Sequence, residues 1–160
     1  MKSSVKLVGC AAVLGLSLAG AAVLSTAAFS QDSEAVLKNR QATMKRMGAD
    51  LDAIKAYLDG KADEAKALTG ATDLDATIRT VVELFPAGTG MEQFPGKSGA
   101  KPGIWTEKEK FDAAHRLAVE KADALLAATK SGDKPAIAAA FADLGKGGCG
   151  GCHTPFREKI

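Results

Sequence analysis

The stretch DSEAVLKNRQATMKRMGADLDAIKAYL, residues 32–58, decides the fold class, because it is long, lacks proline and is patterned with a helical period. Apolar and functional positions recur in it at alternating spacings of three and four, which is typical of one face of an amphipathic helix. These positions are Leu37, Arg40, Met44, Met47, Leu51, Ile54 and Leu58. Arg40 and Met44 are unusual for a helix core and are therefore candidates for a functional role.

Three further helices are predicted beyond Gly60. The second runs over residues 62–84 and is interrupted by Gly70, which makes it the weakest of the four. The third runs over residues 106–129, with Thr106 and Glu109 as a capping box.

The fourth helix is predicted to start after Asp133, with Pro135 in its first turn. Residues 85–103 are rich in Gly and Pro and form a long loop between the second and third helices. No segment alternates with a period of two, so strands are not expected. The pattern predicts an all-α protein, an antiparallel four-helix bundle.

Residues 1–30 are predicted to be an export signal, with Lys2 and Lys6 ahead of an apolar run that ends in small residues. Cleavage is expected after Ser30 or after Ala28, and an uncleaved membrane anchor is the alternative. Cys10 resembles a lipoprotein attachment site but lies too early, before any apolar region. Loss of the two signal lysines leaves basic and acidic residues balanced, which gives no electrostatic basis for nucleic-acid binding.

The tail sequence Cys149-Gly150-Gly151-Cys152-His153 is the pattern of covalent haem c attachment. Positions i and i+3 of a helix share a face, so both thiols can bond one edge of a porphyrin, and His153 follows as the proximal iron ligand. The glycines around the motif are expected to let the backbone approach the flat macrocycle. They are Gly145, Gly147, Gly148, Gly150 and Gly151.

The cysteine pair has two other interpretations. A dithiol redox motif normally follows a strand, and none is expected here. A zinc site needs a fourth ligand, for which only His115 remains as a nitrogen donor.

Because the attachment motif lies at the C-terminus, the chain resembles the class II c-type cytochromes, the cytochrome c-prime family, and among them the low-spin cytochrome c-556 type. The resemblance covers the whole chain after the signal. Its motifs are residues 40–44 (RQATM), 85–89 (FPAGT), 104–105 (IW) and 149–153, followed by Phe156 and Arg157. It implies a signal over 1–30 and one cytochrome domain over 31–160, a four-helix bundle that encloses one covalent haem c.

In that family the residue four positions after the first-helix arginine faces the distal side of the haem, and here it is Met44. A methionine there implies a low-spin, six-coordinate iron bound by His153 and Met44. A core-filling role for Met44 is the alternative, since methionine adapts to irregular gaps. Met47 is expected to be such a filler.

The resemblance also implies roles for two arginines. Arg40 is expected near the haem propionates, because a buried guanidinium needs an anionic partner, with a surface position as the alternative. Arg157 matches a basic residue near the proximal imidazole, or is a solvated charge at the helix end. His115 is expected to be a half-buried histidine of the third helix and not a ligand.

The predicted function is therefore periplasmic, single-electron transport by a His/Met-ligated haem. The alternative is a five-coordinate cytochrome c-prime that binds nitric oxide or carbon monoxide. No acid, base or nucleophile cluster accompanies the motif, so an enzyme is not expected. The expected partners are unidentified redox proteins, with no nucleic acid, no membrane after signal cleavage, and a homodimer through the first two helices as an open alternative.

Overall fold

The computed structural model describes residues 21–160, with side chains from Asp32 onward. Its helices are α1 (Ala21–Leu58), α2 (Glu64–Thr80), α3 (Gly103–Thr106), α4 (Lys108–Ser131), α5 (Lys134–Asp143) and α6 (Gly150–Phe156). A 3-10 turn, η1 (Val81–Leu84), extends α2, and a π-helical turn, η2 (Leu144–Cys149), joins α5 to α6 without a break. The prediction of four helical stretches is confirmed.

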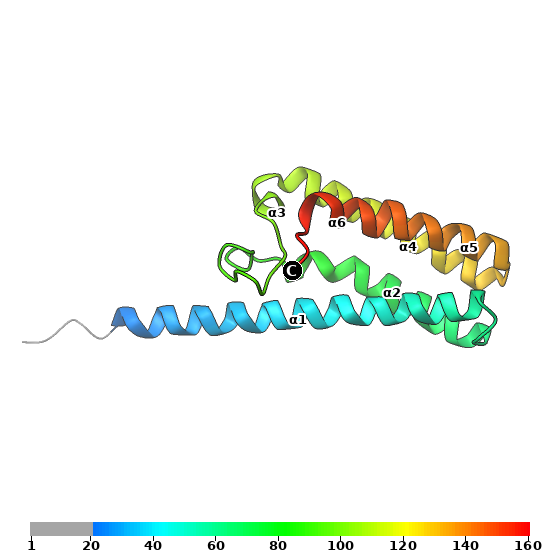
Figure 1. Cartoon of the computed structure of the whole chain (residues 1–160), viewed down its shortest axis with the longest axis horizontal. Helices are drawn as coiled ribbons and strands as arrows, with labels where there is room; N and C mark the ends of the chain where they lie inside the picture. Colours follow the sequence, from blue (N-terminus) through cyan, green and yellow to red (C-terminus); the bar gives the residue numbers. More distant parts are fainter. Residues whose placement is uncertain (1–20) are drawn as a thin grey trace, which may run out of the picture.

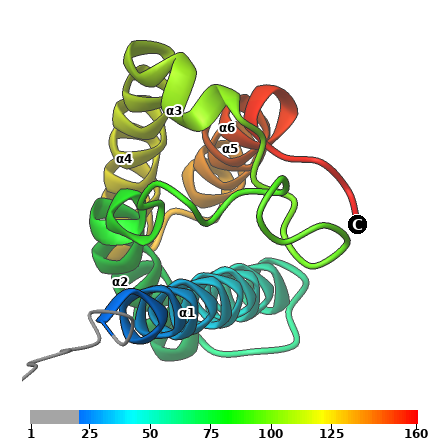
Figure 2. The ribbon, with the colours of Figure 1, turned by 90° about the vertical axis from the view of Figure 1, so that its left-hand side faces the viewer.

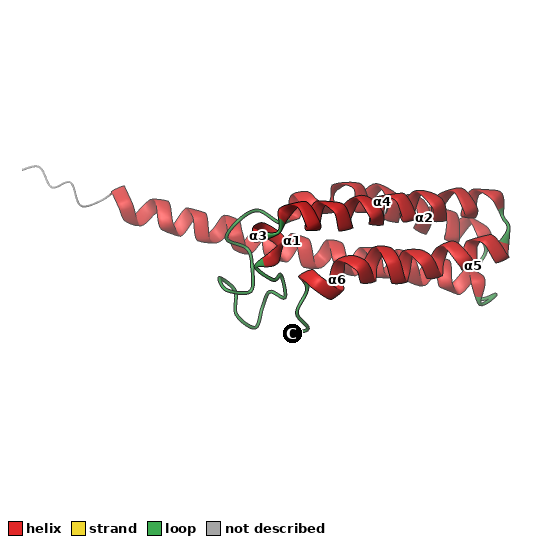
Figure 3. Cartoon of the chain, turned by 90° about the horizontal axis from the view of Figure 1, so that it is seen from above, coloured by secondary structure: helices red, strands yellow, loops and turns green. Residues whose placement is uncertain are grey.

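The four rods run in alternating directions along the long axis of the molecule (Figure 1), so the fold is an all-α, antiparallel four-helix bundle. α1 packs against α2, α2 against α4, and α4 against α5, η2 and α6. Seen from above, α4 and the α5–α6 rod lie side by side along the bundle (Figure 3). Among the described residues no helix is long and apolar enough to cross a membrane.

The main core fills the bundle away from the long loop, and most of its centre consists of residues that the helical period predicts to face inward. Ile54, Leu74, Leu125, Ile137 and Leu144 are each at most 1% exposed. They come from α1, α2, α4, α5 and η2, so one apolar cluster holds all four rods together. Burial of each such side chain contributes about 1.5–3 kcal/mol.

A second, smaller core lies at the end of the bundle that carries the long loop, and it positions the tail motif. Ala100, Ile104, Phe111 and Phe156 form its buried centre. Phe111 contacts the rings of Phe85 and Phe156 edge to face, each with ring centroids 5.3 Å apart. Figure 2 shows the loop folded across this end of the bundle, beside the end of α6.

Helix boundaries depend on local chemistry that the sequence only partly reveals. Gly132 ends α4 in the left-handed region with φ of 71°, where a glycine carries no Cβ penalty. Asp63 caps α2 by accepting a hydrogen bond from the Lys66 amide at 2.9 Å.

The predicted capping box at the start of α4 is wrong. Thr106 belongs to the short helix α3, where its hydroxyl donates to the Pro102 carbonyl, and α4 begins only at Lys108. Asp133 does precede α5 as predicted, but its side chain makes no capping hydrogen bond.

Gly70 does not interrupt the second helix. A Cβ at this position would lie 2.8 Å from the backbone oxygen of Asp50, so the glycine is what lets α2 approach α1 closely. Of the predicted export signal, residues 1–20 lie outside the described residues. Residues 21–30 form the first part of α1.

Candidate haem-binding site

The tail motif lies where the α5–α6 rod changes from π-helical to α-helical geometry. Cys149 is the last residue of η2, and Cys152 and His153 lie in α6. All three are half-buried, and both thiols are free. Cys149 packs against the main core, whereas Cys152 packs against the smaller one, so the motif lies at the boundary between the two clusters.

Gly147 and Gly148, just before the motif, lie close to α4, and the predicted approach of the glycines to a macrocycle stays a prediction. A Cβ on Gly147 would lie 2.6 Å from Cε of Lys121, and one on Gly148 would lie 3.3 Å from Cα of Ala118. Gly148 therefore allows the close packing of η2 on α4, whereas the atom that a Cβ on Gly147 would meet is the end of a flexible side chain. Gly151, in contrast, is exposed, and a Cβ added to it would meet no atom within 4 Å, so it leaves open space beside the motif.

The pKa shifts of the motif side chains differ from those of a reactive dithiol centre. Burial raises the pKa of the Cys149 and Cys152 thiols, whereas reactive dithiols have a lowered pKa. Burial and then the charge of Arg157 lower the pKa of His153. The neutral imidazole, which is the form that binds a metal, is thereby favoured.

The other metal interpretations find no support in the described part of the chain. Residues 32–160 contain no group of three or more His, Cys, Asp or Glu side chains that could hold a metal ion. His115, the remaining nitrogen donor, has its Nε2 atom 2.8 Å from the Ile78 carbonyl oxygen and so bridges α4 to α2. The donor set at the tail, two thiols on one helical face followed by a half-buried imidazole, fits a covalently bound haem.

Arg40 is buried, with 5% of its surface exposed, but its partners are neutral. Nη1 donates to the Leu84 carbonyl at 3.0 Å and to Oγ1 of Thr89 at 2.9 Å. Nη2 donates to the Thr89 carbonyl at 2.6 Å and to Oγ of Ser98 at 3.1 Å. The guanidinium carbon also lies 4.8 Å from the centre of the Phe85 ring.

Arg40 is therefore satisfied by neutral groups within the described part of the chain, and its place near the haem propionates stays a prediction. Its four terminal N–H donors are all used by the long loop and the turn before it, and the cation–π contact adds to them. Desolvation by burial lowers the pKa of Arg40, which is the expected direction for a cation surrounded by neutral groups. A guanidinium nevertheless stays charged in proteins.

Met44 lies on α1 one turn after Arg40 and is half-buried. Met47 packs against the main core, as predicted for a filler, whereas Met44 is not among the described residues that pack against either core cluster. The two methionines on the same helix face therefore differ in their surroundings.

Arg157 follows α6 and ties the chain end to the long loop. It pairs with Ala100 in an isolated antiparallel bridge. Lys101 donates its amide to the Phe156 carbonyl at 3.0 Å, and Glu158 donates its amide to the Gly99 carbonyl at 2.7 Å. Arg157 is exposed, and its charge acts on His153 as described above.

Sequence reasoning missed Thr89 and Ser98, which are each 1% exposed and bind Arg40. Thr89 lies in the FPAGT motif, so its position carried a signal, although not for this contact. Ser98 lies in a Gly- and Lys-rich stretch without any period, and no pattern singled it out.

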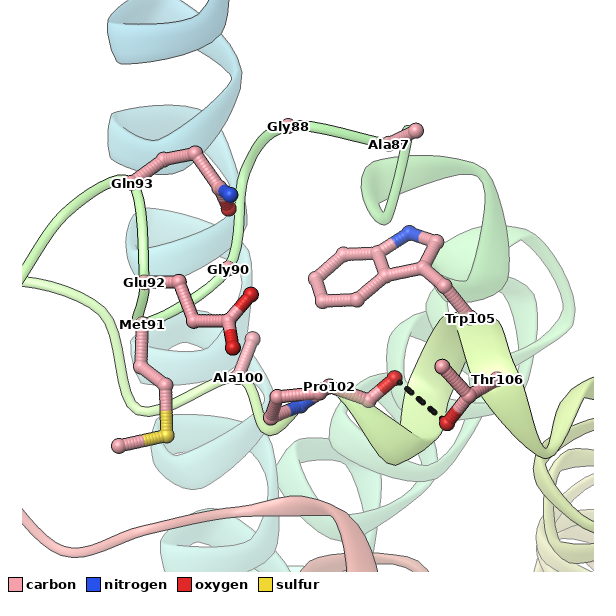
Figure 4. Close-up of a pocket in the computed structure, with 10 residues that line it drawn as sticks. All are labelled: Ala87, Gly88, Gly90, Met91, Glu92, Gln93, Ala100, Pro102, Trp105 and Thr106. Atoms are coloured by element: carbon pink, nitrogen blue, oxygen red, sulfur yellow. Dashed lines mark hydrogen bonds between the residues drawn. The ribbon is translucent and has the colours of Figure 1, made fainter.

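A cavity of about 190 Å³ lies under the long loop. Figure 4 shows the ring of Trp105 on one side of it and the Glu92 side chain on the other. Trp105 donates its indole N–H to the Phe85 carbonyl at 2.9 Å, so the ring is held in place. None of the predicted haem-binding residues lines this cavity, so it is separate from the tail motif.

Comparison with known proteins places these features in context. Residues 35–157 match the family model described as Cytochrome C'. Cytochrome c-556 of Rhodopseudomonas palustris is 32% identical over 145 residues, which cover 89% of this chain and 95% of that protein. Cytochrome c' of Rhodospirillum rubrum is 33% identical over 131 residues, which cover 82% of each protein.

Solved structures agree with the fold. A nitric oxide complex of a variant of cytochrome c prime from Alcaligenes xylosoxidans superimposes with a TM-score of 0.69 at 26% identity. The superposition covers 80% of this chain and 97% of that one.

Proposed function

Because this chain belongs to the cytochrome c' family, whose members carry a covalent haem c, we propose that it carries single electrons through a haem held by Cys149, Cys152 and His153 and closed by Met44. Membership of this family makes the chain an electron-transfer haem protein. The ligand set and the role of each residue go beyond family membership.

The two thiols would form thioether bonds to the porphyrin, and His153 would bind the iron from the proximal side. When bound, the haem supplies a one-electron iron couple. The neutral imidazole favoured at His153 and the half-buried thiols on one helical face support this assignment.

One observation carries the choice of Met44. It is the residue four positions after the buried Arg40, half-buried on the inward face of α1, and it differs from Met47 in not being packed into a core cluster of the described chain. Its thioether is a soft ligand suited to iron, and His/Met ligation raises the reduction potential. These properties suit an electron carrier.

The second candidate is a five-coordinate haem that binds nitric oxide or carbon monoxide, and the comparisons support it better than they support the first. Most of the relatives found are named cytochrome c', and a structural neighbour is a nitric oxide complex. The name of the relative from Rhodopseudomonas palustris, cytochrome c-556, agrees with the first candidate. The residue four positions after Arg40 would decide between the two, and in this chain it is Met44.

An absorption spectrum with a carbon monoxide titration tests the proposal. Six-coordinate His/Met iron gives a weak thioether-to-iron band in the far red, and Met44→Ala is expected to abolish this band and to open the iron to carbon monoxide. Met47→Ala is the matched control, because it removes a methionine one turn away that packs against the main core. If Met44→Ala leaves the ferric spectrum and carbon monoxide binding unchanged, the sixth ligand is not Met44 and the second candidate stands.

We further propose that the protein works in the periplasm after removal of residues 1–30, with redox proteins as its partners. The apolar run of the predicted signal supports export. Whether it acts as a monomer or as a homodimer through α1 and α2 is tested by sedimentation of the mature protein.

A further inference from the structure

Met44 and His153, the two proposed iron ligands, lie on helices that do not pack mainly against each other. α1, which carries Met44, makes its main contacts with α2 and η1, whereas α6, which carries His153, makes its contacts with η2, α4 and α3. The main core links the two helices only indirectly, through α2 and α4, so at the loop end of the bundle their spacing also depends on the segments that connect them there.

The long loop makes that connection, and on the α1 side it is bound by Arg40. The four hydrogen bonds of the guanidinium reach Leu84, Thr89 and Ser98. These acceptors are themselves fixed: the Thr89 hydroxyl donates to the Pro86 carbonyl at 2.8 Å, and the Ser98 hydroxyl donates to the Thr89 carbonyl at 3.2 Å. Arg40 thus closes a loop segment over the face of α1.

Two routes continue from this loop segment to α6. The first is through the backbone: Ser98 Oγ accepts from the Ala100 amide at 3.3 Å, and residues 99–101 pair with the chain end at 156–158. The second is through aromatic rings, because Arg40 stacks on Phe85, Phe85 contacts Phe111, and Phe111 contacts Phe156. Phe156 lies three residues after His153, on the same short helix.

The backbone of the loop also packs closely against the backbone of the chain end. A Cβ on Gly99 would clash with the Glu158 carbonyl oxygen, a backbone atom that cannot move aside alone. A displacement of the loop therefore carries the chain end with it.

We infer that Arg40 is a positioning residue that braces α1 against α6 through the long loop, so that the sixth coordination site depends on Thr89 and Ser98 as well as on Met44. The inference rests on the proposed function for the role of Met44. It differs from a role at the haem propionates, because a brace acts through the loop acceptors and not through the charge alone.

The test removes the two side-chain acceptors of Arg40 and leaves its charge in place. Thr89→Val and Ser98→Ala delete the two hydroxyls that bind Arg40, Arg40→Lys keeps a cation but loses the forked geometry, and Arg46→Gln is the control. Arg46 lies on the same helix but is exposed and bonded to Thr77 on α2. Two readouts are taken on the haem-loaded protein: carbon monoxide binding, and hydrogen exchange at the amides of Lys101 and Glu158, which report the loop–tail pairing.

In the Thr89→Val/Ser98→Ala protein and in Arg40→Lys, we expect both carbon monoxide binding and exchange at the two amides to rise by at least about tenfold. Tenfold is the factor for one lost hydrogen bond to a charged group, and the double variant loses two. Arg46→Gln is expected to match the wild type. If the double variant keeps wild-type values while Arg40→Lys does not, Arg40 acts on the haem directly and the brace is overturned. If the double variant does not fold, Ser98→Ala alone gives the same two readouts, and wild-type values in it overturn the brace.

Failure of the proposed function is separable from failure of the brace. A wild-type protein whose iron is already open to carbon monoxide rejects Met44 as a ligand. In that case the exchange readout still decides: acceleration at Lys101 and Glu158 in the hydroxyl variants supports the brace, and unchanged exchange rejects it.

Discussion

His115 illustrates how a chemically capable side chain is used for structure. Its ring nitrogen bonds the Ile78 carbonyl, so it links α4 to the end of α2. We expect His115→Leu to lower the free energy of unfolding by about 1 kcal/mol, the net value of one lost hydrogen bond, and to leave the haem absorption spectrum unchanged. Thermal unfolding and an absorption spectrum of the same sample check both parts. A changed spin state in this variant would make His115 a ligand.

Asp50 is a residue whose charge opposes the fold. Among the described residues its Oδ2 atom is buried without a hydrogen-bond partner. Burial and then the charge of Asp73 raise the pKa of Asp50, against a smaller opposing effect of Arg46. Because the folded-state pKa is above the unfolded one, the folded state favours the protonated acid. Stability is therefore lost as the pH rises from below the ordinary carboxyl pKa through the raised value.

We accordingly expect Asp50→Asn to raise the melting temperature at neutral pH, and the advantage to vanish below the ordinary pKa of an aspartic acid. Melting curves of the mature protein as a function of pH measure this. Asp52→Asn removes the same charge from an exposed site on the same helix and serves as the control. An advantage of Asp50→Asn that persists unchanged in acid would contradict the explanation.

At the residue scale, the sequence predicted a position where a single local pattern determines it. The tail cysteines and His153 follow from spacing, and the inward faces of Leu37 and Ile54 follow from the helical period. The neutral surroundings of Arg40 did not follow, because two of its acceptors, Thr89 and Ser98, lie 49 and 58 residues further along the chain in a loop without any period.

At the scale of elements, the contact between α1 and α2 depends on one glycine. A methyl group at Gly70 would meet the Asp50 backbone oxygen at 2.8 Å, and neither helix can yield locally. Gly48 is also within a helix, but it is exposed and has no atom within 4 Å of the added carbon.

The two glycines therefore predict opposite effects of the same substitution. Gly70→Ala is expected to destabilise the protein by about 1–3 kcal/mol through overpacking. Gly48→Ala is expected to stabilise it by up to about 1 kcal/mol through helix propensity. Chemical denaturation of both variants tests the pair, and equal effects of the two would show that the close contact does not limit the packing.

The helices themselves were predictable because each has a long apolar face, but their ends were not. The Thr106–Glu109 pattern meets the rule for a capping box, yet the chain uses Thr106 inside α3 to turn the loop. The π-helical turn that ends at Cys149 had no signal beyond a run of glycines, whose packing against α4 requires tertiary contacts that a local pattern does not contain.

At the scale of the whole molecule, the two core clusters stabilise different parts of the fold. The larger one holds the rods together and would be recognisable in any helical bundle, whereas the smaller one joins the long loop, α4 and the end of α6. Cys149 and Cys152 each pack against a different cluster. The haem would therefore be attached where the two cores meet.

The most direct test of this account is the mass of the proteolytic peptide that contains Cys149 and Cys152, taken from protein matured in an export-competent host. The account predicts one peptide heavier by the mass of one haem, with both thiols resistant to alkylation. A protein that is exported and folded, yet yields this peptide without haem and with both thiols alkylated, would contradict it.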